Sequence, residues 1–235
     1  MTLVDVHGLP GSRMAYWWYY LAMVFLSYVL HRPWLMAGIL IFFLLRPFLP
    51  DPGILLRTWG QIQTLTAQIQ ANPANITARR DLAIVWLERL RPRRALELLD
   101  EARTRFPNDA ELLYLTGVAR LRCGDAEGAL EPLVQAVEID PKLRRGDPYL
   151  TAAEALLSLG RIEEAEDALE RYVQANSSSM QGYVLLAVTR QKRGNADGAR
   201  KALDDAFHTW STIPSFRKKG QWYWWARAWF HRVVG

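Results

Sequence analysis

The sequence predicts an all-α protein with a transmembrane helical hairpin over residues 1–50, a helical solenoid over 51–212 and a tryptophan-rich, basic helix over 213–235. Three observations support this prediction. A dense apolar block near the start is interrupted once by polar residues, a motif recurs about every 34 residues through the middle of the chain, and aromatic and basic side chains are mixed at the end.

Each half of the apolar block has the length of one short membrane helix. About 16 residues span roughly 24 Å, against roughly 30 Å for the hydrocarbon core of a bilayer. A single helix through the block would bury Arg32, which costs about 2.5–3.5 kcal/mol, and Pro33 would remove a backbone hydrogen bond. We therefore expect two helices, at about 14–30 and 33–49, with His31, Arg32 and Pro33 forming the turn.

Aromatic and charged residues flank these expected helices. The run WWYY at 17–20 would form an aromatic belt at one membrane interface. Three arginines would share one side of the membrane and Arg32 would lie alone on the other, so the positive-inside rule places the solenoid in the cytoplasm. The three are Arg13, Arg46 and Arg57. The alternatives are a hairpin buried in a soluble protein and a reversed topology with a periplasmic solenoid.

A motif of glycine, alanine and leucine recurs through the middle of the chain. Gly124, Gly160 and Gly194 are each followed by an alanine five residues later and a leucine four residues after that. An earlier copy carries Leu90 in place of the glycine. Each copy predicts two helices, because glycine permits a tight turn and alanine lets the helices approach closely. A single pair cannot bury its apolar face, so neighbouring pairs should stack into a solenoid.

This pattern resembles the tetratricopeptide repeat family over residues 76 to about 212. The clearest copy carries Leu113, Gly117, Gly124, Ala129, Leu133, Ala136 and Pro141. The expected units are a half-repeat at 52–75 and repeats at 76–109, 110–143, 146–179 and 180–212. The chain departs from the family pattern at Arg120 and Arg190, which replace a bulky apolar or aromatic residue, and at Tyr172, which replaces a small one.

The resemblance implies protein binding in a concave groove formed by the first helix of each pair. The lysine and asparagine residues with which some members of the family clamp a terminal carboxylate are missing. Most of the expected lining residues are apolar, which would suit the apolar face of a helix, although several could instead be core between adjacent helices. They are Arg80, Ile84, Leu87, Tyr114, Val118, Leu121, Leu150, Glu154, Leu157, Val184 and Val188.

The last segment, QWYWWARAWFHRVV at 221–234, is predicted to form a helix with an aromatic face. Trp222, Trp225 and Trp229 fall on one side of such a helix. The helix could cap the solenoid by burying this face, lie at a membrane interface with its basic residues toward anionic lipid, or dock a partner. The basic residues near this end are Arg217, Lys218, Lys219, Arg227 and Arg232.

Nothing in the sequence predicts catalysis, a cofactor, a metal or a small-molecule substrate. Nucleophile–base pairs, glycine-rich phosphate loops and metal-ligand clusters do not occur, and the single cysteine, Cys123, excludes an internal disulfide. Acidic and basic residues are interleaved between 76 and 212, which disfavours nucleic acid as a partner. All but five of the 29 basic residues are arginines, a composition typical of GC-rich bacterial genomes.

We therefore expect a scaffold, assembly factor or accessory subunit of a protein complex in the bacterial inner membrane. Its repeats would lie in the cytoplasm, and its partners would be other proteins, above all subunits of that complex, together with the lipid bilayer. The alternatives are a membrane-tethered module that recruits soluble clients and a periplasm-facing protein of envelope assembly or secretion.

Overall fold

The computed structural model describes residues 52–234 and isolated positions between 17 and 38. The chain divides into two compact units, Met1–Pro52 and Gly53–Gly235. Over residues 52–234 the structure is all-α, with ten α-helices, one short 3-10 turn (η2, Leu143–Gly146) and no strand. The helices are α3 (Pro52–Ala71), α4 (Ile76–Glu88), α5 (Pro92–Arg105), α6 (Ala110–Arg122), α7 (Ala126–Ile139), α8 (Asp147–Ser158), α9 (Ile162–Ala175), α10 (Met180–Lys192), α11 (Ala196–Thr212) and α12 (Ser215–Val234).

The expected membrane hairpin over 1–50 lies outside the described residues, apart from the isolated positions. Among these, Tyr28 and Trp34 are helical and Arg32 is not, and the Arg32 guanidinium lies 4.9 Å and 6.0 Å from the centroids of their rings. His31 and Pro33 are outside the described set. In the part of the chain that the structure describes, no helix combines the length and apolar character needed to cross a bilayer. The hairpin therefore stays a prediction.

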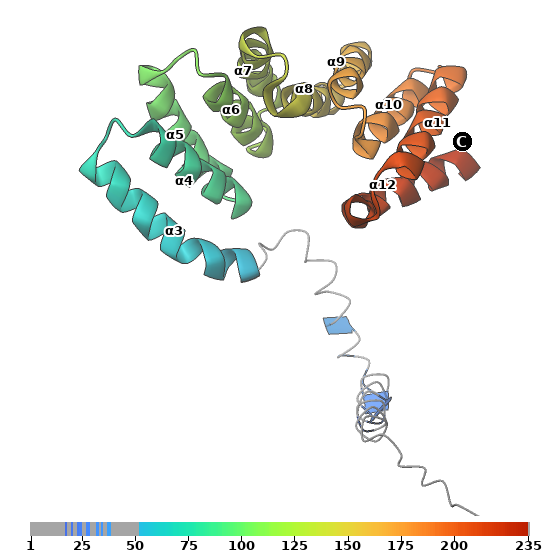
Figure 1. Cartoon of the computed structure of the whole chain (residues 1–235), viewed down its shortest axis with the longest axis horizontal. Coiled ribbons are helices and arrows are strands. Elements are labelled where there is room, and N and C mark those ends of the chain that lie inside the picture. The colour runs from blue at the N-terminus through green and yellow to red at the C-terminus, as the bar shows by residue number, and fades with distance from the viewer. Residues whose placement is uncertain are drawn as a thin grey trace, which may run out of the picture. The chain divides into compact units, whose positions relative to one another are not determined.

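The helices of the second unit form successive antiparallel pairs along an arc (Figure 1). α4 packs on α5, α6 on α7, α8 on α9 and α10 on α11, and each pair also contacts the next. In Figure 1, α6 and α8 lie on the inner side of the arc, and α7 and α9 lie on its outer side. The prediction of a helical solenoid is confirmed.

The recurring alanine and leucine form the core of every pair. Ala152 of α8 packs against the core cluster that joins α4 to α7, and Leu130 of α7 packs against the cluster that joins α8 to α12, so the two clusters are linked. Burial of such side chains stabilises the fold by roughly 25 cal/mol for each Å² of apolar surface. The motif residues, none more than 7% exposed, are Ala95, Leu99, Ala129, Leu133, Ala165, Leu169, Ala199 and Leu203.

A residue in the left-handed region ends the first helix of each pair. Gly124, Gly160 and Gly194 have φ of 89°, 75° and 86°. Leu90, which stands in the glycine's place in the first copy, has φ of 57° and is 46% exposed. A side chain at this angle costs roughly 1–2 kcal/mol. The turn is therefore imposed by the packing of the pair and is kept even where glycine is absent.

The two arginines that depart from the family pattern bridge the helices of their pairs. Nη1 of Arg120 donates to the carbonyl of Gly128 at 2.8 Å, and Nη1 of Arg190 donates to the carbonyl of Gly198 at 3.2 Å. Each arginine thus reaches from the end of the first helix to the first turn of the second. In both pairs a hydrogen bond to a backbone carbonyl takes the place of the apolar contact expected there.

Tyr172 replaces a small residue without opening the core, because the next pair begins with a glycine beside it. The tyrosine is 3% exposed, and a Cβ on Gly182 would lie 2.7 Å from its ring. Its hydroxyl donates to Oγ of Ser179 at 3.0 Å and accepts from Nδ2 of Asn176 at 3.3 Å. The buried hydroxyl is therefore satisfied.

A largely buried ionic network joins α9 to α10. Glu166, only 6% exposed, accepts hydrogen bonds at 2.9 Å from Nε of Arg190 and from Nη1 of Arg193. Burial alone would raise the pKa of the Glu166 carboxyl, but the hydrogen bonds from the two arginines outweigh it and hold the pKa below its usual value. Arg190 also donates to Glu170, so the guanidinium and the carboxylate are both paired.

We expect Gly117→Ala to destabilise the solenoid, because the added Cβ would lie 2.4 Å from Cγ of Leu133. Such overpacking costs roughly 1–3 kcal/mol. Gly60→Ala on α3, where no atom outside the local helix backbone lies within 4 Å of the new Cβ, is the matched control and should cost nothing, because alanine favours a helix. Urea unfolding of the full chain measures both free energies of unfolding. Equal stability of the two variants would contradict the expectation.

The ionic network predicts that Glu166→Gln lowers the free energy of unfolding by an amount that depends on pH. Because the pKa of Glu166 is lowered by folding, its stabilisation is present above the usual glutamate pKa of about 4.3 and is lost as the pH falls through the folded value. The variant should lose about 2 kcal/mol at pH 7, and the gap to the parent should narrow at pH 3. Glu163→Gln, at an exposed partner of Arg193, should stay within about 0.5 kcal/mol at both pH values.

Candidate functional site

Eight of the expected groove residues remain partly accessible and form what we call the inner surface. They come from four successive first helices of the pairs, so the inner surface extends along the solenoid. Two of its side chains are charged and six are aliphatic. The residues are Arg80, Ile84, Val118, Leu121, Leu150, Glu154, Leu157 and Val188.

Three expected groove residues are core instead. Leu87, Tyr114 and Val184 are 5%, 9% and 0% exposed, and each belongs to a buried apolar cluster. Adjacent pairs stack so closely at these positions that neighbouring helices cover them. Arg122, for example, reaches across from α6 and donates to the carbonyl of Leu87 at 2.9 Å. These three residues therefore belong to the core and do not line an open groove.

The inner surface carries one carboxylate near its centre. Glu154 of α8 is exposed, but the surrounding helices remove enough water to raise the pKa of its carboxyl, while the positive charge of Arg122 acts in the opposite direction. Arg80, the other charged residue of the inner surface, pairs with Asp81 at 3.3 Å. The remaining lining is aliphatic, so the surface combines apolar contact area with few fixed charges.

The inner surface opens at one end into a gap between α3 and α4. A cavity of about 640 Å³ lies there, with Leu65 and Ile84 among its apolar walls. Arg57 and Glu88 approach to 3.7 Å across it, as exposed side chains whose attraction is weak in water. In Figure 1, α3 follows the arc as its first helix.

The loop before α8 holds a polar cluster that sequence reasoning missed. Arg144 and Arg145 have φ of 46° and 61°, and Arg144 pairs with Glu111 at the start of α6. Its guanidinium also lies 5.3 Å from the centroid of the Tyr114 ring. Burial, and then the charge of Asp147, raise the pKa of the Tyr114 hydroxyl. The only signal in the sequence is the longer 36-residue spacing at this loop.

The C-terminal helix α12 packs on α10 and α11, and most of this contact lies outside its tryptophan face. Ala228 is fully buried, and Trp224 packs against the last core cluster. Oε1 of Gln221 accepts a hydrogen bond from the backbone N–H of Met180 at 3.0 Å. The small side chain of Ala228 allows close contact between helices, as the alanines of the repeats do.

The tryptophan face of α12 is open to solvent. Trp222, Trp225 and Trp229 are 63%, 38% and 55% exposed, and only Trp225 makes a ring contact, stacking on Trp210 at 5.8 Å. The helix therefore packs on the last pair, and the alternative in which it buries its whole tryptophan face there does not describe Trp222 and Trp229. The side of α12 that faces the last pair is formed by Gln221, Trp224 and Ala228 instead.

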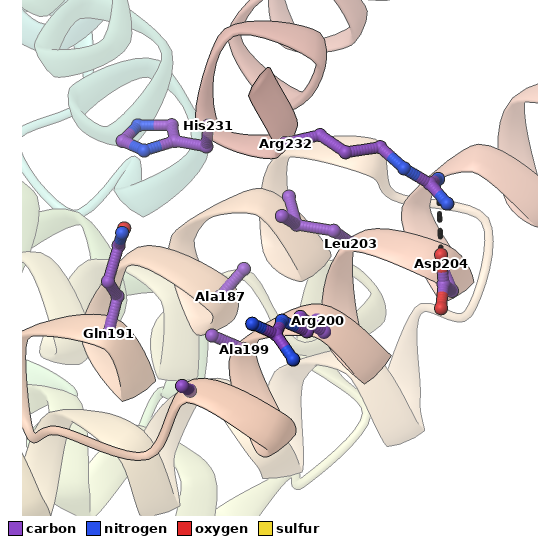
Figure 2. A pocket seen from close by; sticks show the side chains of 9 residues that line it. Ala187, Gln191, Ala199, Arg200, Leu203, Asp204, His231 and Arg232 are labelled. Carbon is purple, nitrogen blue, oxygen red and sulfur yellow. Dashed lines mark ion pairs between the residues drawn. The ribbon is translucent and has the colours of Figure 1, made fainter. Parts of the chain in front are cut away.

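A small cavity of about 280 Å³ lies where α12 meets the last pair (Figure 2). Ala187, Ala199 and Leu203 contribute apolar walls, and Arg232 reaches Asp204 at 3.1 Å across one edge. Burial, and then the charge of Arg227, lower the pKa of His231 at the rim. The rim carries both acidic and basic side chains, so it favours neither an anionic nor a cationic ligand. Over the described residues, no group of three or more His, Cys, Asp or Glu side chains is placed to hold a metal ion.

Comparison with known proteins identifies the repeats. Models of the tetratricopeptide repeat match residues 69–144 and 120–181. A comparison with curated protein sequences finds no relative. Among solved structures, MamA shares 21% identity over 68% of this chain and 95% of its own, with a TM-score of 0.61. MamA from Desulfovibrio magneticus RS-1 shares 15% over 68% and 91%, with a TM-score of 0.61.

A second protein has the same fold. YrrB, described as a tetratricopeptide repeat protein with an unusual peptide-binding site, shares 15% identity over 77% of this chain and 88% of its own, with a TM-score of 0.59. At these identities the likeness concerns the fold. Together with the matched models, it supports tetratricopeptide repeats over residues 69–181, as the spacing of glycine, alanine and leucine predicted.

Proposed function

We propose that this chain is a non-catalytic, membrane-anchored scaffold, assembly factor or accessory subunit of a bacterial membrane protein complex, which acts by binding partner proteins. The inner surface is the observation that carries the proposal. Six aliphatic side chains are partly accessible there on successive helices, and they form a continuous apolar lining that a partner could cover.

The chemistry of the inner surface favours a helix or peptide as its occupant. An amphipathic helix would place its apolar face on the aliphatic residues and a basic side chain near Glu154. The gap between α3 and α4 would admit the end of such a segment. The likeness to YrrB, whose structure is described as having a peptide-binding site, supports this choice of occupant.

Anchoring in the membrane is supported by the first 50 residues. The apolar block has the length of two short spans, and Arg32 lies over aromatic rings, as it could at a membrane interface. Short spans favour lateral packing against other membrane helices, which would suit a subunit of a complex. The repeats would then present their inner surface beside that complex in the cytoplasm.

Purification of the full chain from native membranes in mild detergent tests the proposal. We expect a stoichiometric set of membrane proteins to co-elute, identified by mass spectrometry. Glu154→Lys should lower their recovery at least tenfold, because an unmatched charge in an interface costs several kcal/mol. Glu138→Lys, the same change on an exposed residue of α7, is the matched control and should leave recovery unchanged.

The same experiment separates the alternatives. Equal recovery with the two variants would contradict the inner surface as the binding site. Recovery of the chain alone, or with substoichiometric soluble proteins, would contradict the complex subunit and favour a module that recruits soluble clients.

The cytoplasmic location of the repeats predicts the labelling of the single cysteine. Cys123, at the end of α6, is exposed. In intact cells an impermeant maleimide should leave it unlabelled, and lysed cells should show full labelling. A denatured sample controls for access to the thiol. Ready labelling of intact cells would place the repeats in the periplasm and favour a role in envelope assembly or secretion.

A further inference from the structure

The side of α12 that points away from the solenoid is aromatic. At 3.6 residues per turn, six large side chains fall within an arc of about 140°, opposite Gln221, Trp224 and Ala228, which face the last pair. We call this side the outward face. Its residues are Phe216 (74% exposed), Trp222 (63%), Tyr223 (55%), Trp229 (55%), Phe230 (56%) and Val233 (63%).

The charges around the outward face have one sign. α12 contains no acidic residue. Lys219 falls inside the same arc and is exposed, while Lys218 and Arg227 border it on its two sides. Each of the bordering cations lies over a tryptophan ring, Lys218 at 5.4 Å from Trp210 and Arg227 at 5.5 Å from Trp224.

This combination differs from that of an ordinary protein surface. More than half of each of six large apolar side chains meets water, and such a patch marks a surface that something else covers. Tryptophan and tyrosine prefer the headgroup region of a bilayer, where an apolar ring and a polar edge are both satisfied. Lysine and arginine at the borders can extend toward lipid phosphates while their stems stay on the apolar surface.

The charge pattern favours a lipid surface over a protein partner as the occupant. A protein surface that covered the outward face would have to supply carboxylates at both borders and at Lys219. An anionic bilayer supplies negative charge everywhere along the helix, and each basic residue near it contributes about 1 kcal/mol. An interfacial helix of this kind combines an apolar face with basic flanks.

We propose that the outward face of α12 lies in the headgroup region of a bilayer that contains anionic phospholipid. The last helix then has two roles, since its inner side covers the repeats and its outward face binds the membrane surface. The inference concerns residues 215–233 and does not depend on the hairpin at the start of the chain. It would hold the end of the solenoid at the membrane.

A fluorescent probe on the outward face tests the inference in the full chain. In a Cys123→Ser, Val233→Cys variant, an NBD label would sit on this face, and in the parent chain the same label on Cys123 is the control. The labelled chains are reconstituted in vesicles of phosphatidylcholine with or without 30% phosphatidylglycerol. We expect a blue shift, and quenching by doxyl-labelled lipid, for the label at 233 but not for the label at 123.

The dependence on charge is tested with two matched reversals. Lys219→Glu lies on the outward face, and Lys201→Glu makes the same change on an exposed residue of α11. Reversing one charge removes about 1 kcal/mol of attraction and adds about as much repulsion, so the docked-to-undocked ratio should fall roughly 25-fold in Lys219→Glu. Lys201→Glu should behave as the parent. The blue shift of the label at position 233 should also become smaller at high salt, because salt screens the attraction to anionic lipid.

Failure of this inference can be told apart from failure of the proposed anchor by vesicle flotation of the same samples. Flotation without quenching at position 233 would overturn the lipid-binding face while leaving the hairpin anchor intact. Quenching that is equal in neutral and anionic vesicles would overturn the role of charge. A label at 233 that shifts only when other membrane proteins are added would assign the face to a protein partner and overturn the inference.

Discussion

Close contact between helices at small buried residues is the constraint on which the rest of this structure depends. Ala129 and Gly117 bring α7 against α6, and Leu133 fills the space where a larger residue at 117 would lie. Repeated along the chain, this contact fixes the spacing within each pair and leaves one row of helices on the inner side of the arc. The aliphatic inner surface is a consequence of that stacking, since the same helices must supply both the core and the accessible side.

Polar groups adjust this apolar framework without interrupting it. Arg120 and Arg190 hold their pairs by a hydrogen bond to a backbone carbonyl, and Tyr172 is accommodated by Gly182. The network around Glu166 adds charge at the seam between the third and fourth pairs, where each charged group finds a partner. These departures are local, because each polar group finds its partners within its own pair or the adjoining one.

The last helix, α12, also packs through a small buried residue. Ala228 packs on the last pair as the alanines of the repeats do, but α11 has 17 residues where α5, α7 and α9 have 14, so α12 begins outside the register of the repeat. The opposite, aromatic side of α12 is exposed. The same placement of α12 therefore covers the last pair on one side and leaves an aromatic, basic face exposed on the other.

The sequence by itself determined the repeat, its period and the buried alanine and leucine of each pair, because these depend on a local spacing that recurs in every copy. It also located the turn at Leu90, where the pattern held without the usual glycine. Only the tertiary structure decided which inner residues are accessible. Leu87, Tyr114 and Val184 are covered by neighbouring pairs. Helical periodicity does not distinguish a residue that lines an open groove from one that is buried between two helix pairs. The same holds for α12, because only the tertiary structure shows that Gln221, Trp224 and Ala228 face the last pair while Trp222 and Trp229 stay exposed.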